Sequence, residues 1–269
     1  MNILFLGLGS IGRRHAKLIM DNYTDHKLYA IRSGKGLYGE LDGVTDITWF
    51  DVEDIRPDCA FVCTPTKEHI DDVIDLVTHG IKSIFLEKPI CSNIRRLKIA
   101  VEFAEYLNAT VYVAYPLRFN QTIASCVDID RMTVYCITDA RKWPTYRKTK
   151  QDGGGVLLEL SHEIDYIGYL LGGVKSISGR VKFQDGLDSQ AKLTIKGKYG
   201  KCNVYLDLFS NIESRGFGKW EIYVTDEVFL AQIEYFFANM NNPSIMNNLK
   251  EASDMFRKLI KFREEKYAM

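Results

Sequence analysis

The sequence has little that would cross-link, anchor or interrupt a folded chain. It holds six prolines and six cysteines among 269 residues, and no two cysteines form a Cys-x-x-Cys pair. Its 35 basic and 35 acidic residues cancel, so no excess of positive charge is available to neutralise nucleic-acid phosphates. No apolar run reaches the ~18–20 residues that cross a bilayer. These absences exclude a disulfide scaffold, a dedicated nucleic-acid binder and a membrane-spanning protein.

The cysteines are expected to be reduced and mostly buried, because they are scattered and none has a histidine at metal-ligand spacing. No metal site is predicted. The N-terminus lacks the charged, then apolar, then small-residue order of a signal peptide, so we expect a cytoplasmic protein without membrane attachment. A chain of this length is expected to form about two domains.

Over the first hundred or so residues, short apolar runs alternate with segments of helical period, which predicts βαβ units and a parallel sheet. We predict an α/β, doubly wound Rossmann domain over residues 1–118. Its predicted strands are Asn2–Leu6, Lys27–Ile31, Cys59–Cys63, Ser83–Leu86 and Thr110–Ala114. Its predicted helices are Ile11–Asn22, Glu68–His79 and Ile94–Leu107, the last with Ser92 and Asn93 as its N-cap.

From about Phe119 the apolar residues alternate instead of forming continuous runs, which is typical of antiparallel sheets with one covered face. We predict a second, α+β domain over residues 119–269 with a mostly antiparallel sheet. Its predicted strands are Met132–Thr138, Ser176–Phe183, Ala191–Ile195, Cys202–Phe209 and Trp220–Thr225. Its predicted helices are Val156–Leu171, Val228–Asn239 and Ser244–Glu264.

Gly7, Gly9 and Gly12 stand directly between the first predicted strand and the first predicted helix. In a G-x-G-x-x-G loop the first glycine permits the turn and the second lets backbone approach a pyrophosphate. The third lets the helix pack on the strand, and the helix N-terminus favours the anion. Together with Ser10 and Ile11, these glycines are predicted to bind a dinucleotide.

The second predicted strand lacks the usual acidic residue that accepts from an adenine ribose hydroxyl. Arg32 and Ser33 stand there instead, with Lys35 close behind. A guanidinium and a hydroxyl suit a 2′-phosphate, so the sequence favours NADP, with NAD as the alternative cofactor. The competing interpretation makes Arg32 a solvated surface charge.

Two further predicted strands end in polar turns, at the edge of the sheet where open α/β folds bind their ligands. Thr64 and Pro65 follow one strand, and Glu87, Lys88 and Pro89 follow the next. Of these residues, Thr64, Pro65, Glu87 and Lys88 are predicted to contact the cofactor. A lysine fixed by the following proline can project its ammonium into a cleft and act on a reacting oxygen. The alternative is an exposed lysine ahead of a turn.

In combination these motifs resemble the glucose–fructose oxidoreductase and inositol dehydrogenase family (Gfo/Idh/MocA). The resemblance covers most of the chain and implies a hydride-transfer enzyme acting on a sugar or sugar derivative. It also implies a C-terminal domain whose open sheet supports a homodimer or homotetramer. The stretches that carry it are the glycine loop with His15, Thr64-Pro65-Thr66 with His69, Glu87-Lys88-Pro89, Arg118-Phe119, and the run from Gly153 to Asp165.

By this resemblance the family's catalytic lysine corresponds to Lys88 and its catalytic histidine to His162. The peptide before Pro89 is often cis in relatives. Relatives commonly carry an aspartate four residues before the histidine, whereas this chain has Glu159 three residues before it. The chain is also shorter than usual, and the loss is expected after Leu206.

The residues support this correspondence independently, because Glu159, His162 and Tyr166 would share one face of a continuous helix. A histidine titrates near neutral pH and can exchange a hydroxyl proton. Asp165 would orient the imidazole or face solvent. The competing interpretation makes His162 a satisfied core histidine.

Residues 141–150 hold five cations interleaved with aromatic side chains. In related enzymes the stretch before the glycine-led helix borders the substrate, so Tyr146 and Arg147 are predicted to bind substrate, together with Arg118. Cations here suit an anionic group, such as the carboxylate of a sugar acid or the phosphate of a sugar nucleotide. A solvated loop is the alternative.

These predictions describe an NADP-preferring oxidoreductase of a sugar, sugar-nucleotide or polyol hydroxyl, in which Lys88 polarises the reacting oxygen and His162 exchanges its proton. A non-catalytic sensor on the same fold is one alternative. A glycosidase that oxidises and re-reduces its substrate within one turnover is another. Substrate contacts are assigned to Lys88, Arg118, Tyr146, Arg147, Glu159, His162 and Asp165.

Overall fold

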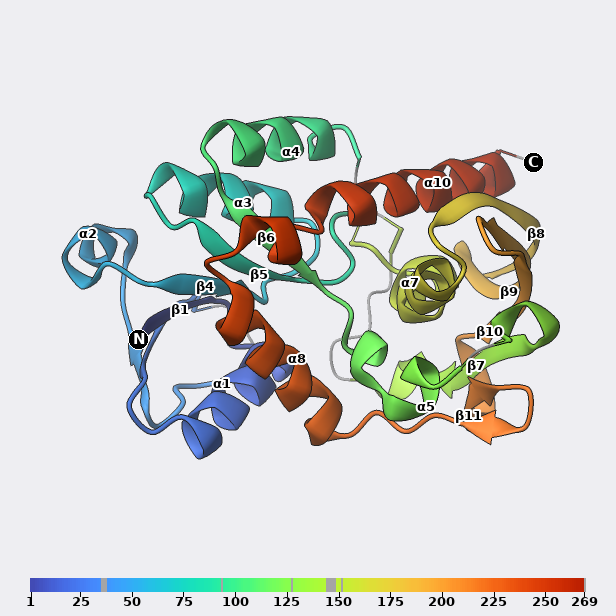
Figure 1. Ribbon diagram of the computed structural model, residues 1–269, viewed down its shortest axis with the longest axis horizontal. Helices are drawn as coiled ribbons and strands as arrows, with labels where there is room; N and C mark the ends of the chain where they lie inside the picture. Colours follow the sequence, from blue (N-terminus) through green and yellow to red (C-terminus); the bar gives the residue numbers. More distant parts are fainter. Residues whose placement is uncertain (35–37, 93, 127, 144–148, 151, 269) are drawn as a thin grey trace. The chain divides into compact units, whose positions relative to one another are not determined.

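The computed structural model describes the whole chain except residues 35–37, 93, 127, 144–148, 151 and 269. The chain divides into two compact units (Figure 1). The first contains Met1–Ala114 and Phe229–Lys250, and the second contains Tyr115–Val228 and Glu251–Met269. The chain therefore returns to the first unit after most of the second is complete. The domain boundary between residues 118 and 119 stays a prediction.

A six-stranded parallel sheet forms the centre of the first unit, in the order β3-β2-β1-β4-β5-β6. This is the strand order of a doubly wound dinucleotide-binding fold, and it confirms the α/β prediction. β1, β4, β5 and β6 are almost wholly buried, as expected of strands covered on both faces. The strands are β1 Asn2–Leu6, β2 Lys27–Ile31, β3 Val44–Asp46, β4 Cys59–Val62, β5 Ser83–Glu87 and β6 Thr110–Ala114.

A row of aromatic rings crosses one face of this sheet. Phe5, Phe61, Phe85 and Tyr112 stand opposite one another in register on four neighbouring strands. The Phe5 and Phe61 ring centroids are 5.0 Å apart, and those of Phe61 and Phe85 are 4.5 Å apart. His15 packs on this row, with its ring 5.2 Å from that of Phe85. The row gives the covering helices a broad apolar surface.

Helices α1 and α8 cover one side of the sheet, and α3 and α4 the other (Figure 1). Helix α4 begins at Leu97 with Arg96 as its N-cap, so the predicted cap at residues 92–93 is wrong. The short elements β3 and α2 were not predicted. The helices of the first unit are α1 Ser10–Asn22, α2 Val52–Ile55, α3 His69–Thr78, α4 Leu97–Tyr106, α8 Asp226–Asn239 and α9 Pro243–Met246, with a 3₁₀ turn at Trp49–Asp51.

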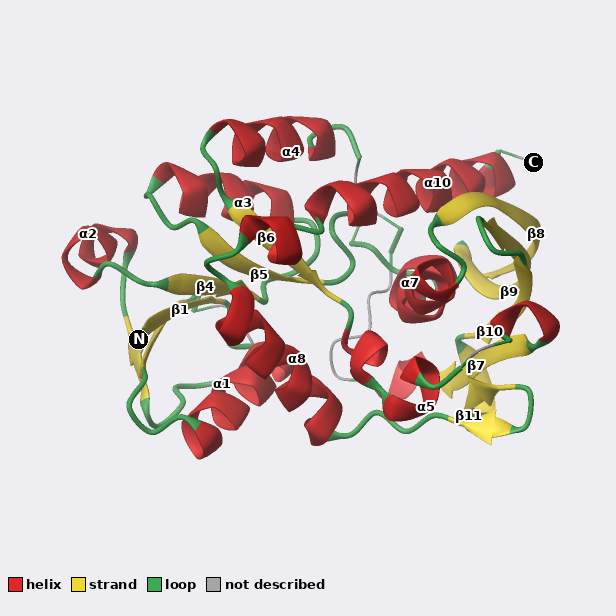
Figure 2. Ribbon diagram, viewed as in Figure 1, coloured by secondary structure: helices red, strands yellow, loops and turns green. Residues whose placement is uncertain are grey.

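The second unit holds a six-stranded sheet in the order β12-β11-β7-β10-β9-β8, yellow in Figure 2. Every neighbouring pair is antiparallel except β7 and β10, which confirms the mostly antiparallel prediction. β11 was not predicted as a strand of its own. The strands are β7 Thr133–Asp139, β8 Val174–Gln184, β9 Leu187–Gly197, β10 Lys201–Asp207, β11 Phe209–Phe217 and β12 Trp220–Glu221.

The helix predicted over Val156–Leu171 is divided at Leu160 into α6 Val156–Glu159 and α7 Ser161–Leu170. The closing helix is divided as well, because α9 ends at Met246 and α10 begins only at Leu249. The remaining helices are the short α5 Gln121–Ala124 and the long α10 Leu249–Tyr267, with 3₁₀ turns at Pro116–Phe119, Ile129–Arg131 and Ala140–Lys142.

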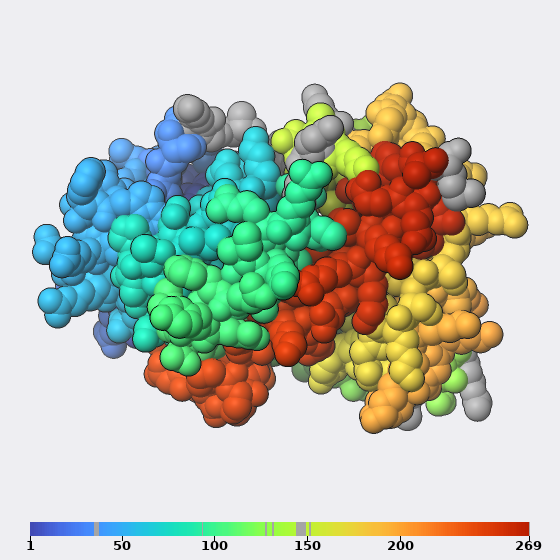
Figure 3. Space-filling view, turned by 90° about the horizontal axis from the view of Figure 1, so that it is seen from above, coloured from blue at the N-terminus to red at the C-terminus, as the bar shows by residue number. Residues whose placement is uncertain are grey.

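Helix α10 lies beside β8, where Lys258 donates to the carbonyl of Val174 and the Tyr267 ring packs edge-on against Phe183 (Figure 3). Five of the six cysteines are buried as predicted, and Cys126 is partly exposed. Among the described helices, none combines the length and apolar character needed to cross a bilayer. The homodimer or homotetramer expected through the second sheet stays a prediction.

Candidate functional site

Three loops of the first unit meet at the carboxyl edge of the parallel sheet. Leu6 stands opposite Val62, and Val62 opposite Leu86, so β1, β4 and β5 end at the same level. The loops that follow these strands contain Gly7, Thr64 and Lys88. The structure therefore brings the glycine loop, the threonine turn and the predicted catalytic lysine to one edge, where open α/β folds bind ligands.

The glycine loop has the shape that a pyrophosphate site needs. Gly7 has a φ of +85°, which favours glycine. A methyl group on Gly12 would clash with the Gly7 carbonyl oxygen, whereas one on Gly9 would meet nothing within 4 Å. Gly9 is the N-cap of α1, no side chain caps this helix, and no acidic residue lies in its first turn. Open space over the uncapped N-terminus of a helix fits the phosphates of a dinucleotide, with Ser10 and Ile11 in that first turn.

Arg32 lies beyond the end of β2 and forms an ion pair with Asp46 of β3. Its Nε donates to Asp46 Oδ1 at 2.8 Å, its Nη2 contacts Asp46 Oδ2, and its Nη1 donates to the Gly39 carbonyl at 2.7 Å. The hydrogen bond with Asp46 raises the pKa of Arg32. Ser33 is exposed, and Lys35 lies outside the described residues. Arg32, which is predicted to bind the 2′-phosphate, thus already has an anionic partner within this unit.

Two residues of α3 fix the threonine turn. The Thr64 hydroxyl donates to the Asp72 carboxylate, and burial raises the pKa of Asp72 to about 6 despite that hydrogen bond. His69 is buried, with its ring nitrogens 2.9 Å from the carbonyl oxygens of Thr64 and Pro89. Both partners only accept, so both contacts are hydrogen bonds when the ring carries two protons. His69 thereby links the turn after β4, which includes the exposed Pro65, to the turn after β5.

Glu87, predicted to contact the cofactor, is 6% exposed and lies 2.7 Å from Nε2 of the wholly buried His15 of α1. Its other oxygen accepts from the backbone N–H of Lys88 at 3.2 Å. The Lys88–Pro89 peptide is cis, and Lys88 itself is half-buried. A buried polar pair therefore joins the helix of the glycine loop to the residue before the predicted catalytic lysine.

In the second unit, Glu159 is the last residue of α6 and is 5% exposed. His162 is the second residue of α7, and its ring lies edge-on to that of Tyr115, with centroids 6.2 Å apart. Tyr166 is wholly buried. Burial and the Glu163 charge raise the pKa of its hydroxyl, and the Arg215 charge opposes that shift. The continuous helix that the prediction assumed is wrong: the break at Leu160 places Glu159 in α6, whereas His162 and Tyr166 are four residues apart in α7.

Asp165 does not face solvent, so that alternative is wrong, and the other alternative, that it orients His162, stays a prediction. Arg118 Nε and Nη2 donate to its two oxygens at 2.8 and 2.7 Å, and Asp165 is 3% exposed. Burial raises the pKa of Asp165, and the Arg118 charge opposes that shift. The guanidinium also lies over the Tyr115 ring and contacts Glu251. Arg118 and Asp165 line a hollow of about 180 Å³ together with part of α10.

Lys88 belongs to the first unit and His162 to the second. Tyr146 and Arg147 lie outside the described residues, and their predicted substrate contacts stay predictions. Among the residues that the structure describes, no cluster of histidine, cysteine and carboxylate side chains could hold a metal ion.

Sequence reasoning missed three residues that shape the site. Tyr115 follows β6 directly, and an aromatic residue before Pro116 at a strand end was a usable signal. His15 was noted only as part of a motif, and its buried position on α1 could not be told from sequence. Asp72 lay within a run of acidic residues, where nothing distinguished it from exposed neighbours.

The residues that form the parallel sheet are similar to a known protein family. The sequence profile of the Gfo/Idh/MocA family, described as an oxidoreductase family with an NAD-binding Rossmann fold, matches residues 1–115. The matched residues make up less than half of the chain, and they contain the glycine loop and all six strands of the parallel sheet.

Individual relatives of this chain are distant. It is 27% identical to the scyllo-inositol 2-dehydrogenase (NAD(+)) of Bacillus subtilis (strain 168) over 191 residues, which are 65% of this chain and 55% of that protein. The matches span between 35% and 55% of the length of the curated relatives.

Two solved structures share the fold. A myo-inositol dehydrogenase from Corynebacterium glutamicum ATCC 13032 aligns with a TM-score of 0.76 at 17% identity, covering 98% of this chain and 96% of that one. The WlbA (WbpB) dehydrogenase from Thermus thermophilus, in complex with NAD and UDP-GlcNAcA, aligns with a TM-score of 0.78 at 14% identity, covering 98% and 94%.

Two glycine substitutions in the loop are expected to have opposite effects. Gly9→Ala should leave the free energy of unfolding unchanged or raise it by up to about 1 kcal/mol, because φ at Gly9 is −72° and the site is open. It should lower dinucleotide affinity at least tenfold, since the methyl group occupies the approach to the helix. Gly12→Ala should cost about 1–3 kcal/mol of stability. Urea unfolding and calorimetric titration with NAD and NADP measure both; equal affinity in wild type and Gly9→Ala would contradict this geometry.

Asp72 makes stability depend on pH in a defined direction. Its pKa is raised from 3.8 to about 6, so between those values the folded state keeps a proton that the unfolded state loses. Stability should therefore fall by about 2 kcal/mol as pH rises from 4 to 6. Asp72→Asn should remove this fall and be more stable than wild type at pH 7.

The neighbouring Asp71→Asn is the control, because Asp71 is half-exposed and pairs with the exposed Arg96. Urea unfolding at several pH values compares the three proteins. An Asp72→Asn profile parallel to that of wild type would show that Asp72 does not titrate in this way.

Proposed function

We propose that the chain is an NAD(P)-dependent oxidoreductase that transfers hydride to or from a hydroxyl or keto carbon of a sugar, sugar nucleotide or polyol. The observation that carries this proposal is the common edge at which β1, β4 and β5 end. There the uncapped start of α1 and the half-buried Lys88 lie on either side of the turn after β4. An anion site beside a lysine suits a dinucleotide and a reacting oxygen.

The proposed cofactor residues are those of the glycine loop, the turn at Thr64 and Pro65, and the segment at Glu87 and Lys88. A bound nicotinamide dinucleotide supplies the hydride donor or acceptor. The turn residues limit its position, because Asp72 holds the Thr64 hydroxyl and His69 contacts the Thr64 carbonyl. Glu87 contributes indirectly, since its contact with His15 ties Lys88 to the helix that follows the glycine loop.

In the proposed reaction Lys88 donates a hydrogen bond to the reacting oxygen, and this bond strengthens as negative charge develops there. His162 takes the hydroxyl proton or returns it, as an imidazole can near neutral pH. Glu159, buried one turn earlier in the chain, is proposed to contact the same substrate. Arg118 is already engaged by Asp165, so we assign it to shaping the substrate site beside Tyr115.

The proposed substrate class draws support from relatives. The Bacillus subtilis relative is named for an inositol, and the Thermus thermophilus structure holds a nucleotide-linked sugar acid. The cations of residues 141–150 favour an anionic substrate by charge. Because the matches cover only part of the curated relatives, the choice among polyol, sugar acid and sugar nucleotide is left to experiment.

Lys88→Met is expected to lower kcat about 10²–10⁴-fold and to leave the dissociation constant of the dinucleotide within about threefold, because the lysine acts mainly in the transition state. His162→Asn should lower kcat by a similar factor. The assay follows NAD(P)⁺ reduction, and NAD(P)H oxidation with the keto forms, across free sugars, inositols, sugar acids and nucleotide sugars. Turnover that survives in Lys88→Met would remove the mechanism.

The same panel separates the competing functions. Tight dinucleotide binding without turnover of any member would favour a non-catalytic sensor. Cleavage of a glycoside without net change in NAD(P)H would favour a glycosidase. Lysine-dependent turnover would establish the oxidoreductase and give its substrate class.

We further propose that Arg32 binds the 2′-phosphate of NADP and makes this the preferred cofactor. The guanidinium is half-buried and oriented by Asp46 and the Gly39 carbonyl, which hold it in place beyond the end of β2. A 2′-phosphate and the Asp46 carboxylate would compete for the same positive charge. Asp46 therefore opposes NADP binding while it orients the arginine.

This competition is tested by paired variants. Arg32→Ala should weaken NADPH binding about 10–100-fold, the loss of one charge-assisted contact, and change NADH binding less than about twofold. Asp46→Asn should strengthen NADPH binding, because the amide no longer repels the phosphate. Calorimetric titration measures all four affinities. Equal losses for the two cofactors in Arg32→Ala would return Arg32 to a structural role.

A further inference from the structure

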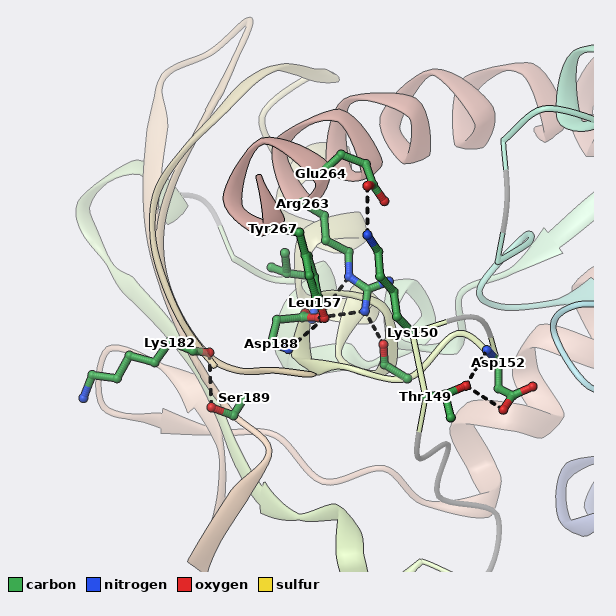
Figure 4. A network of polar contacts seen from close by, with 11 residues as sticks. Thr149, Lys150, Asp152, Leu157, Lys182, Asp188, Ser189, Arg263, Glu264 and Tyr267 are labelled. Carbon is green, nitrogen blue, oxygen red and sulfur yellow. Dashed lines mark hydrogen bonds and ion pairs between the residues drawn. The ribbon is translucent and has the colours of Figure 1, made fainter. Parts of the chain in front are cut away.

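A buried network in the second unit contacts the glycine turn that leads into α6 (Figure 4). Its centre is Asp188 of β9 and Arg263 of α10, which are 0% and 1% exposed. Arg263 Nε and Nη2 donate to Asp188 Oδ1 at 2.9 and 2.7 Å. Nη2 also donates to the carbonyl oxygen of Gly154. The ion pair is thus held away from water and bonded to the backbone of the turn.

The second oxygen of Asp188 reaches the helix itself. Its Oδ2 accepts from the backbone N–H of Leu157, in the first turn of α6, at 2.9 Å. The first N–H groups of a helix lack partners inside it. A carboxylate that accepts from one of them acts as a cap, and its negative charge is attracted to the positive end of the helix. No side chain of the turn caps α6 at Gly155. The cap comes instead from a strand 31 residues away in sequence.

Tyr267 completes the network from the last turn of α10. Its hydroxyl donates to Asp188 Oδ1 at 2.8 Å and accepts from the Asp188 backbone N–H at 3.0 Å. Burial and the Asp188 charge raise the pKa of Tyr267 to about 12, so the hydroxyl keeps its proton at neutral pH. The Asp188 carboxylate therefore accepts from side chains of α10 and from the backbone of α6.

The glycine at position 155 makes this arrangement possible. Gly155 has a φ of +108°, a conformation that side chains rarely adopt. A methyl group there would overlap Asp188 Oδ1 and lie against Arg263 Nη2. The ion pair thus occupies the space that a side chain at position 155 would need, so this turn requires a glycine.

We propose that Asp188 and Arg263 are positioning residues that set the place of Glu159 and His162. The proposal rests on the function proposed above, in which His162 exchanges the substrate proton. Arg263 holds the Gly154 carbonyl and Asp188 holds the Leu157 amide, on either side of Gly155. From this fixed start, α6 runs to Glu159 and α7 begins two residues later.

The test uses Arg263→Met, which keeps the aliphatic stem and removes every donor. Amide hydrogen exchange of residues 154–162 should become at least tenfold faster, because the turn loses its anchor. kcat should fall about 10–100-fold with the KM of the dinucleotide within about twofold, since a shift of ~1 Å in a catalytic group has effects of this size. Arg263→Lys should restore part of the slow exchange and part of kcat. Its single ammonium reaches Asp188 or Gly154, whereas the guanidinium bonds to both residues at once.

Two controls separate positioning from general stability. Glu265 of α10 lies two residues after Arg263 and is exposed, so Glu265→Gln should change neither exchange nor kcat. Ile129 is buried in another part of the unit, and Ile129→Ala supplies a destabilised protein without touching the turn. If Ile129→Ala lost as much kcat as Arg263→Met, the effect would be one of stability and the proposal would be overturned.

The remaining outcomes also decide. Unchanged exchange over residues 154–162 in Arg263→Met overturns the proposal, whatever the activity. If wild type turns over no substrate, the proposed function fails, and the exchange data alone then decide whether the pair sets this segment. Should Arg263→Met not fold, Tyr267→Phe and Arg263→Lys take its place, and each must speed exchange over residues 154–162 for the proposal to stand.

Discussion

A carboxylate taken out of water needs a partner, and this need connects the segments on which the proposed chemistry depends. In the first unit the aromatic row gives α1 and α8 a surface to pack on, but such packing is not directional. The contact of Glu87 with His15 adds direction, because it joins the end of β5 to one position on α1. In the second unit Asp188 joins β9, α6 and α10 in the same way. Each proposed catalytic residue follows closely a segment fixed by such a contact.

The parallel sheet could be predicted almost to the residue because its central strands are covered on both faces and therefore read as continuous apolar runs. The elements that escaped prediction lack that cover. β3 is three residues long and mostly exposed, so no apolar pattern marks it. β11 carries an exposed stretch from Asn211 to Glu213 and is recognised by its pairing with β7 and β12. Local sequence carries the signal of burial, and where burial is slight the signal is lost.

Sequence reasoning anticipated local geometry where it depends on backbone shape and missed contacts between partners distant in sequence. The glycine loop is a local pattern, and its geometry followed from its spacing. The break at Leu160 left no trace, because this leucine is buried and continues the apolar stripe of a single helix. The partner of Asp165 lies 47 residues away and that of Asp188 lies 75 residues away. Arg32 was read correctly as a cation at the end of β2, but nothing near it in sequence announced Asp46.

The separation of Gly154 and Arg263 has a consequence for how the molecule is made. They are 109 residues apart, and the arginine is in the last helix. At about 5–20 residues per second, a ribosome adds Arg263 on the order of ten seconds after the turn. Until then a nascent chain has the strand that carries Asp188 but not the cation that neutralises it. A chain that stops between Lys250 and Arg263 would contain every segment of the first unit, but the turn before α6 would lack its arginine anchor, and the proposed proton-exchange residue His162 follows that turn.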